Sequence, residues 1–392
     1  MSYTSHSSHS SHSDHQLKMI YIDNNATTAI APEVFAAMRP FLETSHGNPS
    51  SVHAAGRVAL EAVEAGRMSV AGMLGADASE IVFTSGGTES DNWAIRGALD
   101  ASPDKKHIVT TRVEHEAVRN LCERLERDGY SVTWLDVDER GMLDLEQVRD
   151  AVRTDTAVVS VMLANNDTGV LFPVAEVASI VKENSDALMH VDGVNAAGKI
   201  PIDLSHGSID LFSISAHKFH GPKGIGALYV RNGVRLPSML IGGGQESGMR
   251  AGTEAVHQIV GIGAAADLVR DLSSIEEVRR LRDKLEDEIL RTIPNAFLNG
   301  STEQAHRLPN TSNISFEDRN GEVILAKLDD AGICISTGSA CNAADHRSSA
   351  VLQAMNVPYT RAMGSIRFSL SRYTTEAEID MTLKHVAGIM GV

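Results

Sequence analysis

The chain has 392 residues, a formal net charge of −16 and a hydrophobic content of 42%. Single hydrophobic cores stop growing near roughly 250–300 residues, so this length predicts two domains. The acidic balance argues against non-specific binding to nucleic acid or to an anionic membrane surface. No apolar run approaches the roughly 20 residues of a membrane helix, and no signal peptide is evident. Three cysteines without a CxxC pair predict neither a disulfide framework nor a metal site, and we expect a cytoplasmic protein.

The N-terminal tract, residues 1–18, is rich in serine and histidine and has low complexity. Tracts of this kind bind metal ions loosely in some proteins. We interpret residues 1–18 instead as a disordered tail or a tag, and they play no part in the fold prediction.

Strand-like and helix-like segments alternate from Met19 onward. Seven apolar runs are typical of strands, at residues 80–85, 107–113, 131–137, 157–165, 187–193, 209–215 and 226–230. Helical patterns such as 89–99 and 114–128 separate most of them, which predicts βαβ units, a mainly parallel sheet and an α/β fold. The last run, 226–230, is expected to return as a hairpin-like partner.

The pattern changes near residue 266. Residues 267–293 predict one long, charged, amphipathic helix, and the segments after it indicate a smaller α+β domain. We assign residues 31–265 to the large domain, and residues 19–30 and 266–392 to the small one.

Five predicted strands are each followed by a polar residue at the carboxyl end. These residues are Thr88, His115, Asn166, Asp192 and Lys218. In an open parallel α/β sheet, ligands bind at this edge. The sequence therefore predicts one site built from five separate strands.

The chemistry of this site follows from the residue types. Lys218, in SISAHKFHGPKG, follows an apolar strand, and a desolvated lysine amine is a nucleophile able to form a Schiff base. Asp192 ends another apolar strand and needs a cationic partner to stay ionised. A protonated pyridine nitrogen would be such a partner.

A phosphate site is predicted next to the lysine. The turn 85–88, which contains Gly87 and Thr88, opens a helix whose N–H groups can hold a phosphate. Ser215 and His217 flank the strand end and add two further contacts, and His115 can stack on a planar ring. Together these groups predict pyridoxal phosphate, bound at its phosphate, ring nitrogen and aldehyde.

Taken singly, each of these residues has an ordinary structural interpretation. Gly-rich turns are common, Asp192 fits a helix N-cap, and Lys218 fits a buried ion pair. Because all of them are predicted at one edge of the sheet, we prefer the functional interpretation to the structural one. A nucleotide site is not expected, because GPKGIG (221–226) lacks the ending of a P-loop.

The three thiols differ in their surroundings. Cys122 lies in an amphipathic helix and Cys334 in an apolar run, so both are expected to be structural. Cys341 lies in STGSACNAADHRSS, which is typical of a mobile surface loop. A nucleophile that serves the cofactor site is the preferred interpretation of Cys341.

These motifs resemble the cysteine desulfurases, which are fold-type I pyridoxal-phosphate enzymes related to the class-V aminotransferases. The matching segments are YIDNNATT, GNPSSVHAAGR, EIVFTSGGTESDN, VEHEAV, ANNDTG, HVDGV, SAHKFHGPKGIGALYV, GGGQESGMRAGTE, STGSACNA and SIRFSLSRYTTEAEID. The resemblance covers all of the chain except the tail. It implies a large domain with a mainly parallel seven-stranded sheet and a smaller α+β domain.

The resemblance also implies roles for the matching residues. Lys218 would hold the cofactor and move the substrate's Cα proton, Asp192 would pair with the ring nitrogen, and His115 would stack on the ring. Phosphate contacts are implied for Gly87, Thr88, Ser215 and His217, and for Thr253 from the other subunit of a homodimer. Asn166 would contact the cofactor, and together with Arg367 it would fix the substrate carboxylate.

The implied reaction converts L-cysteine to L-alanine. Sulfur passes as a persulfide on Cys341 to an acceptor protein, for iron–sulfur assembly or for the thiolation of tRNA or DNA. A selenocysteine lyase, a C–S lyase, an aminotransferase of the same fold and a non-catalytic assembly partner are the alternatives. The cofactor and substrate residues argue against the last, and the STGSAC segment argues against an aminotransferase.

Two departures from the family pattern stand out. Asn195 replaces the usual glutamine that bonds the cofactor's 3′-oxygen, and it is one methylene shorter. Residues 344–349, after Cys341, also differ from the usual Ser-Leu-Glu-Pro-Ser turn.

Overall fold

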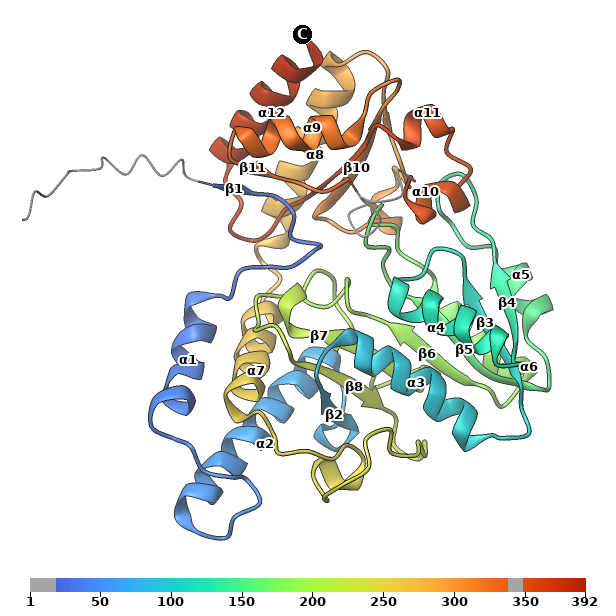
Figure 1. The fold of residues 1–392 in the computed structure, drawn as a ribbon, viewed down its shortest axis with the longest axis vertical. Helices are drawn as coiled ribbons and strands as arrows, with labels where there is room; N and C mark the ends of the chain where they lie inside the picture. Colours follow the sequence, from blue (N-terminus) through green and yellow to red (C-terminus); the bar gives the residue numbers. More distant parts are fainter. Residues whose placement is uncertain (1–18, 338–347) are drawn as a thin grey trace, which may run out of the picture.

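The computed structural model describes residues 19–337 and 348–392. Its largest element is a seven-stranded sheet with the order β2-β8-β7-β6-β5-β3-β4 (Figure 1). The strands are β2 (Ile81–Thr84), β3 (His107–Thr111), β4 (Ser131–Leu135), β5 (Thr156–Met162), β6 (Leu188–Asp192), β7 (Leu211–Ser215) and β8 (Gly226–Val230). All seven predicted strands are confirmed, with slightly shorter bounds for all but the last.

The strands from β7 to β4 pair in parallel, whereas β8 pairs antiparallel with both β7 and β2. Successive strand residues face opposite sides of the sheet. Val158 packs on one side with Val118, and Val159 packs on the other with Val177. Both faces are therefore buried, which explains why the sequence of these strands is apolar rather than alternating.

Helices cover the two faces of the large sheet (Figure 1). One face carries α3 (Gly87–Ala101) and α4 (Glu116–Arg127). The other carries α1 (Pro32–Glu43), α2 (Ala54–Leu74), α5 (Leu145–Ala151), α6 (Val174–Asn184) and α7 (Val256–Arg270). This three-layer arrangement agrees with the predicted α/β fold.

A second region forms around an antiparallel sheet with the order β12-β10-β9. Its strands are β9 (Ala296–Leu298), β10 (Thr311–Phe316) and β12 (Ser365–Ser369), and its helices are α8 (Ile275–Thr292), α9 (Gly321–Asp330) and α12 (Glu376–Met390). These elements share a separate hydrophobic cluster that includes Ile22, Leu285 and Phe368. The short strand β1 (Ile20–Tyr21) joins this region by pairing with β11 (Ile333–Cys334).

Two short helices, α10 (Ala350–Ala354) and α11 (Tyr359–Ala362), lie between β11 and β12 in sequence but pack against the large sheet. Leu352 and Ala362 belong to the hydrophobic cluster of the large sheet. The assignment of residues 31–265 to one domain and of residues 19–30 and 266–392 to another stays a prediction.

The single long helix predicted for residues 267–293 is wrong. The chain breaks between Arg270, the last residue of α7, and Ile275, the first of α8. The Asp271 side chain accepts the N–H of Ser273 at 2.9 Å, a local bond that competes with the helical pattern. In the part of the chain that the structure describes, no helix combines the length and apolarity needed to span a membrane.

Candidate active site

A cavity of about 290 Å³ lies at the carboxyl edge of the large sheet. Its lining includes nine of the predicted site residues, namely Gly87, Thr88, His115, Asn166, Asp192, Asn195, Ser215, His217 and Lys218. They come from the ends of β5, β6 and β7 and from the starts of α3 and α4. The sheet topology thus brings together residues that are up to 131 positions apart in sequence, from Gly87 to Lys218.

Lys218 ends a 3₁₀ turn, Ala216–Lys218, that follows β7 directly. Its side-chain nitrogen donates a hydrogen bond to the main-chain oxygen of Asn25. Burial, and next the positive charge of Arg367, lower the pKa of Lys218 from 10.5 to about 8. A sizeable fraction of this amine is therefore neutral, and nucleophilic, near neutral pH.

Three buried carboxyl groups, Asp91, Glu114 and Asp192, lie at or beside the cavity, and we call them the acidic cluster. Burial raises the pKa of all three, and that of Glu114 to about 8. Asp91 Oδ1 and Glu114 Oε2 have no hydrogen-bond partner. Within residues 19–337 and 348–392, no lysine or arginine forms an ion pair with the cluster. Asp91 Oδ1 lies 3.6 Å from His190 Nε2, but burial lowers the pKa of His190 to about 3, so this ring is neutral. The cluster therefore favours a cationic ligand group.

The first turn of α3 faces the cavity near β7. Gly86 precedes the helix with a φ of 149°, a conformation that favours glycine. A Cβ atom on Gly87 would lie 2.7 Å from Val194 Cγ2, so a larger residue there would have to displace the Val194 side chain. The free N–H groups of this turn and the helix dipole favour an anion.

Two histidines at the cavity are held in defined orientations. His115 is the N-cap of α4, and its Nδ1 accepts the N–H of Ala117 at 3.1 Å, which leaves the hydrogen on Nε2. His217 Nδ1 bonds Thr27 Oγ1 at 3.2 Å. Burial, together with the nearby Lys218 charge, lowers the pKa of His217 to about 4, so its ring is neutral.

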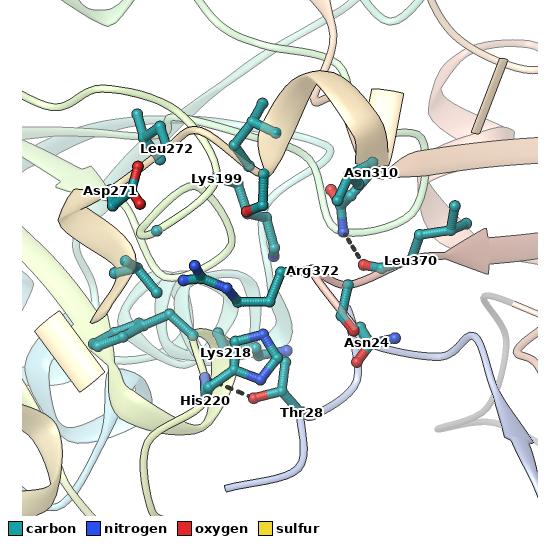
Figure 2. A pocket seen from close by; sticks show the side chains of 17 residues that line it. Asn24, Thr28, Lys199, Lys218, His220, Asp271, Leu272, Asn310, Leu370 and Arg372 are labelled. Carbon is teal, nitrogen blue, oxygen red and sulfur yellow. Dashed lines mark hydrogen bonds between the residues drawn. The ribbon is translucent and has the colours of Figure 1, made fainter. Parts of the chain in front are cut away.

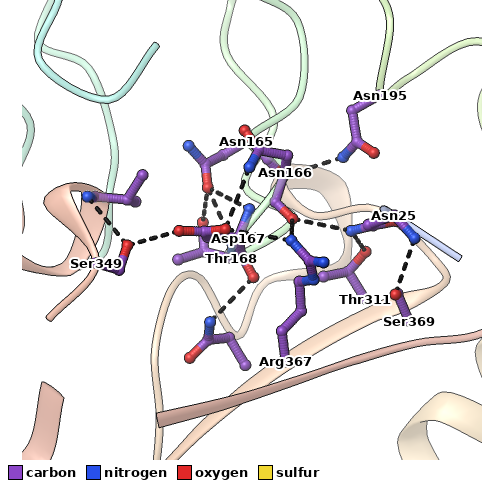
Figure 3. A network of polar contacts seen from close by, with 12 residues as sticks. Asn25, Asn165, Asn166, Asp167, Thr168, Asn195, Thr311, Ser349, Arg367 and Ser369 are labelled. Carbon is purple, nitrogen blue, oxygen red and sulfur yellow. Dashed lines mark hydrogen bonds and ion pairs between the residues drawn. The ribbon is translucent and has the colours of Figure 1, made fainter. Parts of the chain in front are cut away.

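Arg367 on β12 is not part of the cavity lining, but it contacts Asn166, which is (Figure 3). Its guanidinium donates to Asp23 Oδ1 at 2.7 Å and to Asp167 Oδ1 at 3.3 Å. It also donates to the main-chain oxygen of Asn166 at 3.1 Å, while its buried Nε has no partner. Arg367 therefore adjoins Asn166 and already has two carboxylate partners.

The loop that carries Asn166 is fixed by its neighbour Asn165 (Figure 3). Asn165 Oδ1 accepts the N–H groups of Asp167 and Thr168, both at 2.9 Å. Such side-chain turns hold a loop in one conformation without regular secondary structure. Asn166 is thereby positioned between the cavity and Arg367.

Comparisons with known proteins agree with this geometry. Residues 20–382 match the family model described as aminotransferase class-V. A cysteine desulfurase of Trichormus azollae is 53% identical over 370 residues, which cover 94% of this chain and 92% of that protein. Among solved structures, a NifS-like protein has a TM-score of 0.89 and 38% identity over 95% of this chain and 99% of its own. A structure described as SspA in complex with cysteine has a TM-score of 0.80 and 34% identity over 91% of this chain and all of its own.

The chain belongs to the cysteine desulfurase family. Members of this family use pyridoxal phosphate, and the cavity fits that group on three counts. Lys218 offers a nucleophilic amine, the acidic cluster favours a protonated ring nitrogen, and the close-packed glycines at α3 leave helix N–H groups open to a phosphate.

Besides Arg367, Thr253 is a residue singled out by the resemblance to this family that does not line the cavity. Thr253 is exposed in this chain, in a loop that an Arg250–Glu89 ion pair of 2.9 Å ties to the start of α3. Cys341 lies outside the described residues. The described chain on either side of it is anchored beside Arg367, because Arg367 donates its N–H to Ser336 at 2.7 Å and Ser349 donates to Asp167 at 2.6 Å.

Several residues at or beside the cavity were missed from the sequence. Asp91 follows Thr88 by three positions on α3, so helical spacing could have placed both on the cavity face. Glu114, Asp23 and Lys199 gave no comparable signal. Their positions depend on contacts between segments far apart in the chain.

Proposed function

We propose that this protein is a pyridoxal-phosphate-dependent desulfurase that converts L-cysteine to L-alanine and passes the sulfur to Cys341. The observation that carries the proposal is the convergence of Lys218, the acidic cluster and the start of α3 on one cavity. The family membership supports the same activity.

The cofactor would be held at three points. Lys218 would bind its aldehyde carbon, Asp192 would pair with its ring nitrogen, and Gly87 and Thr88, with Ser215 and His217, would hold its phosphate. When bound, the cofactor supplies an electron sink for charge at the substrate's Cα. Lys218, freed from the aldehyde by the substrate, would then carry the Cα proton.

The substrate carboxylate would bind Arg367 and Asn166. The unpaired Nε of Arg367 offers a donor for it. Asp23 and Asp167 hold the guanidinium plane in place, which limits the entropy lost when the substrate binds. His115, with its hydrogen on Nε2, would donate a proton near the substrate sulfur.

Cys341 would receive the sulfur. Its thiolate would form an S–S bond to the substrate sulfur as the Cβ–S bond breaks, and the electron pair would stay with the three-carbon product. Residues 336 and 349, on either side of Cys341, are anchored beside Arg367 and Asp167. Both ends of the segment that contains Cys341 therefore lie next to the proposed substrate carboxylate site, which supports this role.

The remaining features concern partners. Thr253 would reach the phosphate site of a second subunit in a homodimer, and Arg250 would hold its loop. A sulfur-acceptor protein would take the persulfide in a reducing cytoplasm. Iron–sulfur assembly and thiolation of tRNA or DNA are the candidate destinations.

The test is to incubate the purified holoprotein with L-cysteine and to quantify alanine and pyruvate. Wild type should form alanine, Cys341→Ser should not, and Cys122→Ala should resemble wild type because the Cys122 thiol is fully buried. Pyruvate as the product would indicate a lyase. Alanine formed equally by Cys341→Ser would remove the assigned role of Cys341.

A further inference from the structure

Lys199 is a buried lysine for which the proposed reaction has no use. Its side chain is 7% exposed, and it lines a second, smaller cavity of about 40 Å³ that also contacts Lys218 (Figure 2). Burial and the positive charges of Lys218 and Arg367 lower the pKa of Lys199 well below its usual value. A buried amine surrounded by cations costs stability, so we asked what this side chain holds.

The amine of Lys199 bonds a single residue, Asn195, at two points. It donates to the main-chain oxygen of Asn195 at 2.8 Å and to its side-chain Oδ1 at 3.0 Å. Both oxygens are acceptors, and even a neutral amine has the two hydrogens that this requires. Lys199 thereby fixes the Asn195 side chain relative to its own backbone.

The orientation of the Asn195 amide follows from its two neighbours. Its Nδ2 donates to the main-chain oxygen of Asn165 at 3.2 Å, and that oxygen can only accept (Figure 3). Oδ1 must therefore face Lys199, because the flipped amide would set its oxygen against the Asn165 oxygen and lose that bond. One Nδ2 hydrogen is left over, and Asn195 lines the main cavity.

We propose that Lys199 is a positioning residue that holds the Asn195 amide with its remaining N–H toward the 3′-oxygen of the bound cofactor. The inference rests on the proposed function, since it requires pyridoxal phosphate in the main cavity. The shorter asparagine reaches less far than glutamine, so its direction matters more. Lys199 lines the smaller cavity and not the main one, so it fixes that direction from outside the cofactor cavity.

A donor on the 3′-oxygen stabilises that oxygen as an anion. The stabilised anion interacts less strongly with the proton on the nitrogen that links Lys218 to the cofactor, so the pKa of that nitrogen falls. Hydrogen bonds to charged groups correspond to about 1–2 pKa units. Loss of the correctly oriented donor should raise the linkage pKa by about 1 unit.

The experiment is a pH titration of the visible absorption of the purified holoprotein. Lys199→Met should raise the linkage pKa by about 1 unit, and Lys199→Gln, which keeps a donor, should restore most of the wild-type value. Asn195→Ala should raise the pKa at least as much as Lys199→Met. That variant tests the inference even where Lys199→Met fails to fold.

The decisive control is Lys199→Met in the Asn195→Ala background. If Lys199 acts through Asn195, the second substitution should add almost nothing. An equal shift in both backgrounds would mean that Lys199 acts by its charge alone and would overturn the inference, as would an unshifted Asn195→Ala. A wild type with no visible band after cofactor addition would contradict the proposed function itself, which separates the two failures.

Discussion

Arg367 has two carboxylate partners within the chain, whereas Asp192 has no cationic side chain paired with it among the described residues. Both side chains are nearly inaccessible, and both adjoin the same site. A buried charge that is already paired holds its geometry without a ligand, while an unpaired one is stabilised only when a ligand supplies the opposite charge. This difference is consistent with the proposed reaction, in which the acidic cluster would serve a cofactor that stays bound and Arg367 a substrate that comes and goes.

Lys218 lies between these two regions, and its substitution should have the largest effect. Arg367 lowers its pKa, while Asp192 and Asp23 raise it. Lys218→Ala should abolish the visible cofactor band and reduce alanine formation by at least about 10²–10⁴-fold, because it removes both the amine that binds the cofactor and a proton carrier. Absorption spectra and product assays check this. Lys182→Ala, at a lysine that pairs with Asp210 away from the cavity, should keep the band.

Asp192→Asn removes the charge of the carboxylate that has no cationic partner in the described part of the chain. The variant cannot pair with a ring cation, so the cofactor should bind about 10–100-fold more weakly, as expected for the loss of a buried charge pair worth a few kcal/mol. Fluorescence titration of the cofactor-free protein measures the change. Asp91→Asn keeps the Asp192 charge and should weaken binding far less; equal losses in both variants would contradict a specific role for Asp192.

Glu114→Gln should change how stability depends on pH. The folded pKa of Glu114 is raised to about 8 from 4.5, so the folded state holds a proton that the unfolded state releases. The protonated Glu114 therefore contributes to the free energy of unfolding at acid pH. This contribution is lost as pH rises through about 8, at up to about 1.4 kcal/mol per pH unit. Glu114→Gln should remove this slope in urea unfolding between pH 5 and 8.

The control for Glu114 lies on α4, the helix that begins two residues after it. Glu123 is exposed, so Glu123→Gln should retain the wild-type slope. A wild-type protein whose stability is flat between pH 5 and 8 would contradict the buried, protonated state of Glu114.

Asp23→Asn weakens one of the two ion pairs of Arg367 and should have the smallest effect. The amide keeps an acceptor for Arg367 but removes a negative charge that competes with the substrate carboxylate. The KM for L-cysteine should fall by about 3–5-fold with little change in kcat, equivalent to about 1 kcal/mol. Asp136→Asn, which alters an exposed pair with Arg112, should leave KM unchanged. A raised KM would mean that Asp23 helps to hold Arg367 in place more than it competes.

The sequence predicted the large sheet well because its signals are local. Each strand is a short apolar run buried on both faces, so β8 (Gly226–Val230) has the bounds that its pattern indicates. The edge rule then placed Lys218, Asp192 and His115 together. The break at Asp271 was missed because one side-chain bond decided it.

The paired side of the site was harder to predict. Arg367 came from the resemblance alone, because nothing in SIRFS distinguishes a substrate residue from a charged strand residue. Asp23 and Lys199 depend on contacts that a local pattern cannot encode. Asp23 contacts Arg367, which is 344 positions away in sequence. The position of Lys199 matters only because Lys199 bonds Asn195, which in turn bonds Asn165.

The hydrogen bond from Asn25 N–H to Ser369 Oγ, 2.9 Å long, joins residues 344 positions apart, and Lys218 donates to the same Asn25. At roughly 5–20 residues per second, the ribosome needs about 20–70 s to add that stretch of chain. During this time the strands of the large sheet are already available to pair, while Asn25 still lacks its partners on β10 and β12. Cofactor capture would then follow translation rather than accompany it, and the growing chain would carry no reactive site until its last strand has emerged.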